Sequence, residues 1–322
     1  MAIDILAFGP HPDDAEIGCG GMLLKMKSLG YTTGIIDMTR GDMGWGTPEE
    51  RDQECADAAK ILKLDVRETL DMGDCRVEDT FENRCKVAQA IRKHQPQIIF
   101  APYYNLPIGR GLGHNDHFKT GILVSQGFNF SHLRKMPIEG EPWQAKAIFY
   151  YFLPAGTPPT FIVDVSEHYE DWRKALEVHR TQFSNPEKPR PAAGPGSIMD
   201  WFEIYARRDA AAVGARYSQS YYSTSPLKVG DPMMLVRDEL GVEVVERPID
   251  RTELYLADEI FFCGTGVQIA AITRIDHRIV GTGKLGSLTS DLRKLYFNVV
   301  RGKVDKYRDL CAPVYQRTEI NA

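Results

Sequence analysis

The sequence has no apolar run close to the about 20 residues that a membrane helix needs, and no excess of basic residues. Over 322 residues, 39 Lys and Arg stand against 44 Asp and Glu, which gives a net charge of −5. Residues 1–14 include Asp4 and only a short apolar stretch, which is not typical of a signal peptide. These absences argue against a membrane helix, secretion and a general polyanion-binding surface. We therefore expect a cytoplasmic protein with no membrane and no nucleic acid among its partners.

Cysteine is scarce and scattered. The six cysteines include no Cys-x-x-Cys pair, the spacing found in many zinc and redox sites. In a chain of this length we expect free, buried thiols in a reducing compartment. Aromatic residues are plentiful, because 14 Phe, 14 Tyr and 4 Trp are present. This supply of core material excludes a largely disordered chain.

Short apolar segments alternate with helical patterns through the first hundred residues. Strands are expected at 3–9, 33–38, 66–71 and 97–101, and helices at 22–29, 48–63 and 81–94, the first of them behind glycines 18, 20 and 21. This alternation predicts an α/β fold with a three-layer, Rossmann-like and mostly parallel sheet. Ligands of such sheets gather beyond the carboxyl ends of the strands. The segments after 3–9 and after 97–101 are therefore candidate sites.

The texture of the sequence changes after about residue 235. Before that point, strands are expected at 147–152 and 160–165 and helices at 166–181 and 197–213. Beyond it, short strands are expected at 242–245, 259–263, 267–272 and 278–280, with a short helix at 251–257 and a closing helix at 285–300. We expect two domains, 1–234 and 235–322, the second a small α+β appendage.

The first chemical cluster is His11-Pro12-Asp13-Asp14-Ala15-Glu16, directly after the first expected strand. Imidazole and carboxylate groups form a ligand set that zinc accepts, and a catalytic zinc needs three protein ligands and an open position. Adjacent residues in a turn point in different directions. Asp13 and Asp14 can therefore take different roles, one on a metal and the other on a water molecule.

The second cluster is His114-Asn115-Asp116-His117, at the end of the loop that follows the strand at 97–101. Two imidazoles three residues apart can share one face of a helical turn, and Asp116 can orient one of them. A single His-Asp pair is more often a surface or capping feature than a metal site. On spacing alone, a metal site and a pair of surface features remain alternatives.

Four segments make the pattern more specific: FGPHPDDAEIGCGG at 8–21, the TRGDMG turn at 39–44, Arg51, and HNDH at 114–117. Together they resemble the zinc-dependent deacetylases of the LmbE/PIG-L type, which remove acetyl from N-acetylglucosamine units. The resemblance runs from residue 1 to about 234. The stretches DILAFGPHPDDAEIGCGG, VDVSEHYEDWRKALEVHRTQF and ARYSQSYYS most resemble the bacillithiol-pathway enzymes, which deacetylate N-acetylglucosaminyl malate.

By this resemblance, His11, Asp14 and His117 are the metal ligands. The expected metal is zinc, and ferrous iron is the alternative that the same ligands would accept. Asp13 corresponds to the general base that takes a proton from the attacking water. The residue chemistry agrees, because a carboxylate beside a water activated by a metal is a competent base.

The resemblance also implies roles outside the ligand set. His114 corresponds to the imidazole that stabilises the oxyanion or protonates the leaving amine, and Asp116 to its orienting partner. Arg51 corresponds to an arginine that contacts substrate, and a guanidinium suits a malate carboxylate. A helix-surface ion pair is the alternative for Arg51. His179 and Gln182 lie where the family often has a His-x-x-Gln helix, near the site or in the subunit contact.

From about residue 237 the sequence resembles the C-terminal part of class IV, branched-chain-type aminotransferases. The matching stretches are ELGVEVVERPIDRTELYLADEIFFCGTGVQIAAITRIDHRIVGTGKLGS and LRKLYFNVVRGKVDKY. In that family a turn like Gly264-Thr265-Gly266 helps to hold the cofactor phosphate. The Schiff-base lysine and the glutamate that pairs with the pyridine nitrogen lie upstream of the matched part and have no counterpart here. The resemblance therefore predicts a fragment without chemistry of its own, fused behind a deacetylase.

The leading hypothesis is a zinc amidohydrolase whose partner is a small-molecule N-acetylglucosaminide, in a chain that forms a homo-oligomer. One alternative is a pyridoxal-phosphate enzyme related to branched-chain aminotransferases, which requires a Schiff-base lysine. Another is a noncatalytic sugar- or metal-binding module on the same fold. Such a module needs the metal ligands but can dispense with Asp13, so the presence of Asp13 favours catalysis.

Overall fold

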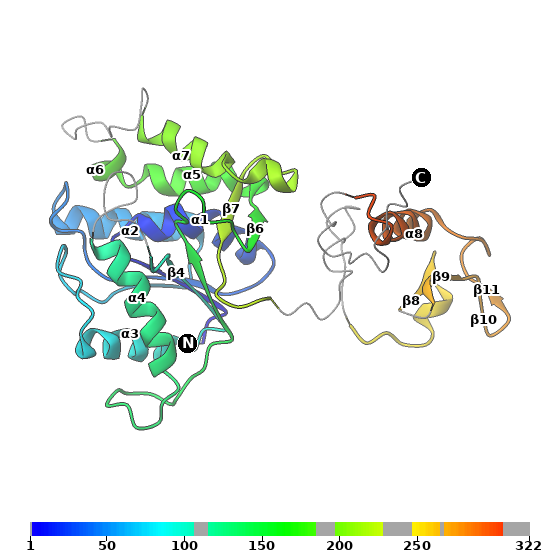
Figure 1. Ribbon diagram of the computed structural model, residues 1–322, viewed down its shortest axis with the longest axis horizontal. Coiled ribbons are helices and arrows are strands. Elements are labelled where there is room, and N and C mark those ends of the chain that lie inside the picture. The colour runs from blue at the N-terminus through cyan, green and yellow to red at the C-terminus, as the bar shows by residue number, and fades with distance from the viewer. Residues whose placement is uncertain (1, 106–114, 185–196, 228–246, 265–266, 305–322) are drawn as a thin grey trace, which may run out of the picture. The chain divides into compact units, whose positions relative to one another are not determined.

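The computed structural model describes residues 2–105, 115–184, 197–227, 247–264 and 267–304. The chain divides into two compact units, Met1–Leu227 and Lys228–Ala322 (Figure 1). The domain boundary expected at 234/235 falls outside the described residues. No helix in the described ranges combines the length and the apolar character that crossing a membrane requires.

The first unit is built on a five-stranded parallel sheet in the order β3-β2-β1-β4-β5. Its strands are β1 (Ile5–Gly9), β2 (Thr33–Asp37), β3 (Val66–Thr69), β4 (Ile98–Pro102) and β5 (Ala147–Tyr151). β1 and β2 are buried along their whole length, as expected of parallel strands covered on both faces. The predicted α/β fold with a mostly parallel sheet is confirmed.

Helices cover both faces of this sheet and make it the middle of three layers (Figure 1). On one face, α3 (Phe81–His94) packs against α4 (Asn115–Phe130). On the other, α1 (Asp14–Ser28) and α2 (Pro48–Leu62) pack against α5 (Tyr169–Glu177). A further helix, α7 (Ile198–Arg207), adds to this second layer through Phe202, whose ring packs edge-on against Trp172 of α5.

Local sequence signals set the starts of α2 and α3. Thr47 precedes α2 and forms a capping box with Glu50 of its first turn, and Pro48 is the first helical residue. Each of the two side chains accepts a hydrogen bond from the backbone N–H of the other residue. Thr80 caps α3 by accepting a hydrogen bond from the backbone N–H of Asn83. Both helices therefore begin at the residue that the sequence predicts.

The first helix begins earlier than predicted. α1 starts at Asp14, so the glycines expected to precede the helix lie inside it. A Cβ atom at Gly18 would lie 2.2 Å from the ring of Tyr151 on β5. One at Gly20 would lie 2.6 Å from the ring of Trp172 on α5. Glycine is a poor helix former, but here its small size lets two aromatic rings pack directly on the helix.

The single helix expected at 166–181 is also wrong. It is divided into a short 3-10 turn, η1 (Ser166–His168), then α5, then α6 (Arg180–Phe183). His179 leaves the helical conformation between α5 and α6, with φ −76° and ψ 61°. Its fully buried ring places Nε2 3.1 Å from Oε1 of Glu16 on α1. This tertiary contact accompanies the break in the helix.

A small antiparallel pair completes the first unit. β6 (Phe161–Asp164) pairs with β7 (Ser218–Tyr221), and only β6 is predicted by the sequence. β7 reads Ser-Gln-Ser-Tyr, which lacks an apolar alternation, yet all four of its residues are buried. The helix expected at 197–213 is divided in turn into α7 and a 3-10 turn, η2 (Ala210–Val213).

The second unit consists of short elements. β8 (Ile260–Gly264) and β9 (Gln268–Ile272) form an antiparallel hairpin, and two-residue strands β10 (Arg274–Ile275) and β11 (Arg278–Ile279) form another. The 3-10 turn η5 (Glu253–Tyr255) precedes them, and the helix α8 (Ser287–Val300) follows. The carboxylate of Glu259 caps α8, because it accepts hydrogen bonds from the backbone N–H groups of Leu288 and Thr289. The strand expected at 242–245 lies outside the described residues.

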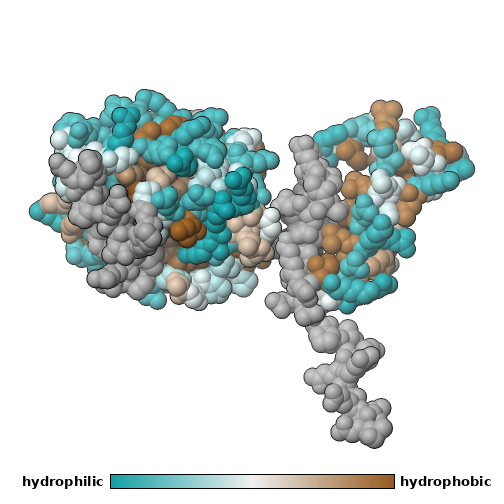
Figure 2. All heavy atoms as spheres, turned by 90° about the horizontal axis from the view of Figure 1, so that it is seen from above, coloured by the Kyte–Doolittle hydropathy of each residue, from teal (hydrophilic) through white to brown (hydrophobic). Residues whose placement is uncertain are grey.

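Large apolar side chains lie on the surface of the second unit. Leu256 is 83% exposed and Phe262 on β8 is 64% exposed. Figure 2 shows apolar residues distributed over the visible face of this unit. The first unit, by contrast, buries most of its large aromatic residues in one continuous core, although Tyr31, Trp45 and Phe81 are exposed.

Candidate metal centre

The two chemical clusters meet at the carboxyl edge of the central sheet. From β1 the chain adds β2 and β3 on one side of the sheet and then β4 and β5 on the other side. Ligands of open α/β sheets bind at such a switch point. The loop after β1 supplies His11, and α1 then begins at Asp14. α4 follows β4 and supplies Asp116 and His117 in its first turn.

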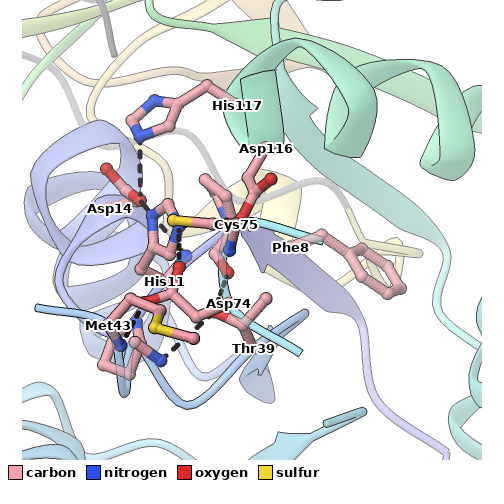
Figure 3. Close-up of polar contacts among 12 residues, drawn as sticks. Phe8, His11, Asp14, Thr39, Met43, Asp74, Cys75, Asp116 and His117 are labelled. Carbon is pink, nitrogen blue, oxygen red and sulfur yellow. Dashed lines mark hydrogen bonds and ion pairs between the residues drawn. The ribbon is translucent and has the colours of Figure 1, made fainter. Parts of the chain in front are cut away.

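Three side chains converge here (Figure 3). Asp14 Oδ2 lies 2.9 Å from His11 Nδ1 and 3.4 Å from His117 Nε2. The three ligand atoms lie within 4.8 Å of one another. A tetrahedral zinc with bonds of about 2.0–2.1 Å separates its ligand atoms by about 3.3 Å, so these spacings fit such an ion.

The other nitrogen of His11 faces a second pair of carboxylates. His11 Nε2 lies 3.2 Å from Asp74 Oδ1 and 3.4 Å from Asp116 Oδ2. A hydrogen on Nε2 directed at these oxygens leaves the Nδ1 lone pair for a metal, the arrangement in which a carboxylate orients a ligating imidazole. The two carboxylates are themselves held by backbone N–H groups, that of Met43 on Asp74 Oδ2 at 2.8 Å and that of Cys75 on Asp116 Oδ2 at 2.7 Å.

The electrostatics of the cluster favour a cation. Burial by itself would lower the pKa of His11, but Asp116, Asp14 and Asp74 raise it well above its ordinary value. For the carboxyl of Asp14 the directions are opposite: burial would raise its pKa, but His117 and His11 lower it below its ordinary value. The negative potential that retains a proton on His11 equally attracts a divalent cation, so the donor set and its charge both fit a metal.

Asp13 occupies the junction between β1 and α1. Its backbone has φ 106° and ψ −31°, a conformation that residues with a side chain rarely adopt. Its side chain makes no capping hydrogen bond to α1, although aspartate at this position usually does. Burial and the neighbouring Asp14 raise the pKa of Asp13 to about 6, against the opposing effects of Arg51 and His179. A carboxylate with a raised pKa is a stronger proton acceptor, which is what its predicted role requires.

Arg51 extends from α2 toward the junction between β1 and α1. It is 3% exposed, so the alternative of an ion pair on the helix surface is wrong. Its Nη2 donates a hydrogen bond to the backbone oxygen of Pro12 at 2.9 Å. Gly41 has φ 67°, and a Cβ atom there would lie 2.5 Å from Nη2. The TRGDMG turn therefore has glycine where the guanidinium passes.

A cleft of about 430 Å³ opens over these groups. It is lined by His11, Asp13, Asp14, Arg51 and His117, and also by the 41–44 turn, Asp74, Cys75 and Gln182. Nε2 of Gln182 donates to the backbone oxygen of Trp45 at 2.8 Å and so ties α6 to the segment beside that turn. Of the His-x-x-Gln pair expected near the site, Gln182 lines the cleft. His179 is not among the lining residues, and its Nε2 contacts the Glu16 carboxylate instead.

The structure brings together the ligand triad, Asp13 and Arg51. Asp116 lies beside His11 and Cys75. Its predicted partner, His114, lies outside the described residues, so that pairing and the role of His114 remain predictions. Sequence reasoning missed Asp74, although it follows β3 and therefore belongs to the same sheet edge.

Comparison with known proteins finds relatives of the first unit. Residues 6–128 match the family model for PIG-L, GlcNAc-PI de-N-acetylase. Over these residues the chain is similar to the PIG-L family. It is 29% identical over 230 residues to the diacetylchitobiose deacetylase of Thermococcus kodakarensis, which covers 67% of this chain and 80% of that protein. It also resembles the crystal structure of the conserved protein TT1542 from Thermus thermophilus, with a TM-score of 0.63, 36% identity and coverage of 70% of this chain and 97% of that one.

A separate stretch of 83 residues is 47% identical to a probable branched-chain-amino-acid aminotransferase of Aquifex aeolicus. This stretch is 26% of the chain and spans only 27% of the length of that aminotransferase. The lysines of the described second unit, at 284, 294 and 303, are all exposed, whereas a Schiff-base lysine sits in a cofactor pocket. Thr265 and Gly266 of the expected phosphate-binding turn lie outside the described residues.

We expect the change His117→Ala to abolish most metal binding, because it removes one of the three candidate ligand atoms, which come from His11, Asp14 and His117. Elemental analysis of wild-type protein after zinc loading and desalting should find near-stoichiometric metal. The matched control is His132→Ala, which changes an exposed histidine and should leave the metal content unchanged. Full metal retention by the His117 variant would contradict the ligand assignment.

Proposed function

We propose that the first unit is a metal-dependent deacetylase that hydrolyses the acetamide of an N-acetylglucosamine conjugate. The observation that carries this proposal is the position of Asp13, a carboxylate with a raised pKa, in the same cleft as His11, Asp14 and His117. A metal triad without a proton acceptor would fit a binding module instead. The family description and the similarity to a diacetylchitobiose deacetylase support an N-acetylated sugar as the substrate class.

We propose zinc as the metal held by His11, Asp14 and His117. Two imidazoles and one carboxylate are a common zinc set that leaves a position open, and ferrous iron would accept the same ligands. When bound, such an ion supplies a Lewis acid that polarises the acetyl carbonyl and lowers the pKa of water. Asp74 and Asp116 hold His11 in the orientation that directs Nδ1 toward the other two ligands.

Side chains of the protein accept and donate the protons of the reaction. Asp13 accepts a proton from the water that attacks the acetyl carbon. The C–N bond breaks to release acetate, and the leaving nitrogen must gain a proton to depart as an amine. His114 is the predicted donor of that proton. We propose that Arg51 binds a substrate oxygen, and its position in the lining of the cleft supports this role.

The narrower substrate that we propose is N-acetylglucosaminyl malate, the intermediate of bacillithiol biosynthesis. Arg51 supports this choice, because a buried guanidinium binds a carboxylate through paired hydrogen bonds and malate carries two carboxylates. The resemblance of the stretches at 4–21 and 163–183 to enzymes of that pathway supports it too.

The proposal is tested by measuring amine release from three substrates: N-acetylglucosaminyl malate, diacetylchitobiose and free N-acetylglucosamine. Zinc-loaded protein should act on N-acetylglucosamine units, with the highest kcat/KM for the malate conjugate. Removal of the metal with a chelator should abolish the activity, and added zinc should restore it. Absence of amine release from all three substrates would contradict the proposed function, whereas a preference for diacetylchitobiose would contradict only the malate assignment.

We expect Asp13→Asn to retain the metal but to lower kcat by about 10²-fold or more, because the amide preserves the shape and removes the proton acceptor. Asp171→Asn is the matched control, since Asp171 lies on the surface in an ion pair with Lys174. It should leave both metal content and kcat unchanged. Near-normal turnover of the Asp13 variant would show that another group is the base.

The second unit is expected to be dispensable for this reaction. All described candidate site residues belong to the compact unit that ends at Leu227. A chain that ends at Met234 should therefore deacetylate with a roughly unchanged rate constant. The full chain should bind no pyridoxal phosphate covalently, as judged by absorbance in the cofactor band. A truncated protein that is folded and metal-loaded but inactive would show that the second unit contributes to function.

A further inference from the structure

Phe152 follows β5 directly and has an unusual backbone conformation. Its φ is 58°, in the left-handed region that bulky side chains rarely adopt. The side chain is nevertheless buried, with 6% exposed. A conformation of this kind persists only where the surrounding structure holds it in place, and an observed outlier is a reason to look for a function.

Both neighbours of Phe152 are tied to other parts of the fold. The hydroxyl of Tyr151 donates to the backbone oxygen of Phe8 on β1 at 2.6 Å, and the backbone oxygen of Tyr151 accepts from the N–H of Tyr103 at 2.8 Å. On the other side, Arg208 donates to the backbone oxygen of Leu153 at 3.3 Å. The chain therefore enters and leaves position 152 at fixed points.

The ring of Phe152 lies against the imidazole of His117. The two rings are stacked, with centroids 5.9 Å apart and an interplanar angle of 21°. The rings of Tyr151 and Tyr205 pack edge-on against Phe152, at 4.7 Å and 6.4 Å. The imidazole of His117 also contacts the ring of His11, at 5.4 Å. His117 thus has aromatic contacts with a metal-ligand candidate and with an apolar ring.

We infer that Phe152 is a positioning residue, which orients the His117 imidazole toward Asp14 and His11; the inference rests on the proposed metal-dependent function. The terminal torsion of a histidine side chain is broad, so an isolated imidazole rotates over a wide range. A stacked ring limits that rotation. The same ring excludes water from one face of His117, and an apolar wall strengthens metal–ligand interactions next to it.

The test compares three variants of the full chain by competition with a zinc chelator. Phe152→Leu keeps an apolar side chain but removes the stacked ring, and we expect zinc affinity to fall about 10-fold, as for other supporting residues of metal sites. Phe152→Tyr keeps the ring and should retain wild-type affinity. Phe149→Leu is the matched control, because Phe149 is a buried phenylalanine of the preceding strand, β5, that packs against Phe100 and Phe161. It should lose stability in thermal unfolding without losing zinc affinity.

The outcomes separate this inference from the proposed function. If the wild-type protein binds no zinc, the proposed metal centre fails and the inference fails with it. If the wild type binds zinc and Phe152→Leu binds it equally well, only the inference is overturned. A similar loss of affinity in Phe149→Leu, or a failure of Phe152→Tyr to preserve affinity, would attribute the effect to general packing and would also overturn it.

Discussion

The carboxylate of Asp14 contacts both imidazoles of the candidate metal centre, and the rest of the site depends on where that carboxylate is held. Its Oδ2 atom lies between His11 Nδ1 and His117 Nε2, which come from two connections of the sheet. Asp14 can reach both because it is the first residue of α1, which begins almost immediately after β1. A helix that started at residue 22 would leave this carboxylate in a loop with no fixed direction.

The early start of α1 is secured by contacts that radiate from Glu16, one half-turn further along the helix. Its carboxylate pairs with Arg67 of β3 and with His179, and its backbone oxygen accepts from the indole N–H of Trp172. Arg67 also pairs with Asp37 at the end of β2. Burying carboxylates is costly unless they are paired, so the shared guanidinium allows two of them to lie inside the fold. The resulting network joins α1 to β2, β3 and α5.

Three residues around the cleft have unusual backbone conformations that position groups of the site. Asp13, Cys75 and Phe152 all have positive φ, at 106°, 61° and 58°. Each such residue costs of order 1–3 kcal/mol, and each delivers a group to the site. Asp13 brings its carboxylate into the cleft, Cys75 directs its N–H to Asp116, and Phe152 stacks on His117. The continuous core of the first unit supplies the stability that offsets the cost of these conformations. The second unit has no comparable site among its described residues, and it exposes large apolar side chains such as Leu256 and Phe262.

Local sequence patterns are enough to predict the β–α alternation, the starts of α2 and α3, and the sheet edge at which the two clusters meet. These features follow from periodicity, from caps such as Thr47 with Glu50, and from chain order, all of which are local. The start of α1 at Asp14 depends on tertiary contacts, because Glu16 pairs with Arg67 and His179 and the rings of Tyr151 and Trp172 pack on the glycines of the helix. The tertiary structure alone placed Asp74 beside His11, buried Arg51 and turned Asp116 toward Cys75. Those contacts join residues far apart in the chain, so no local pattern records them.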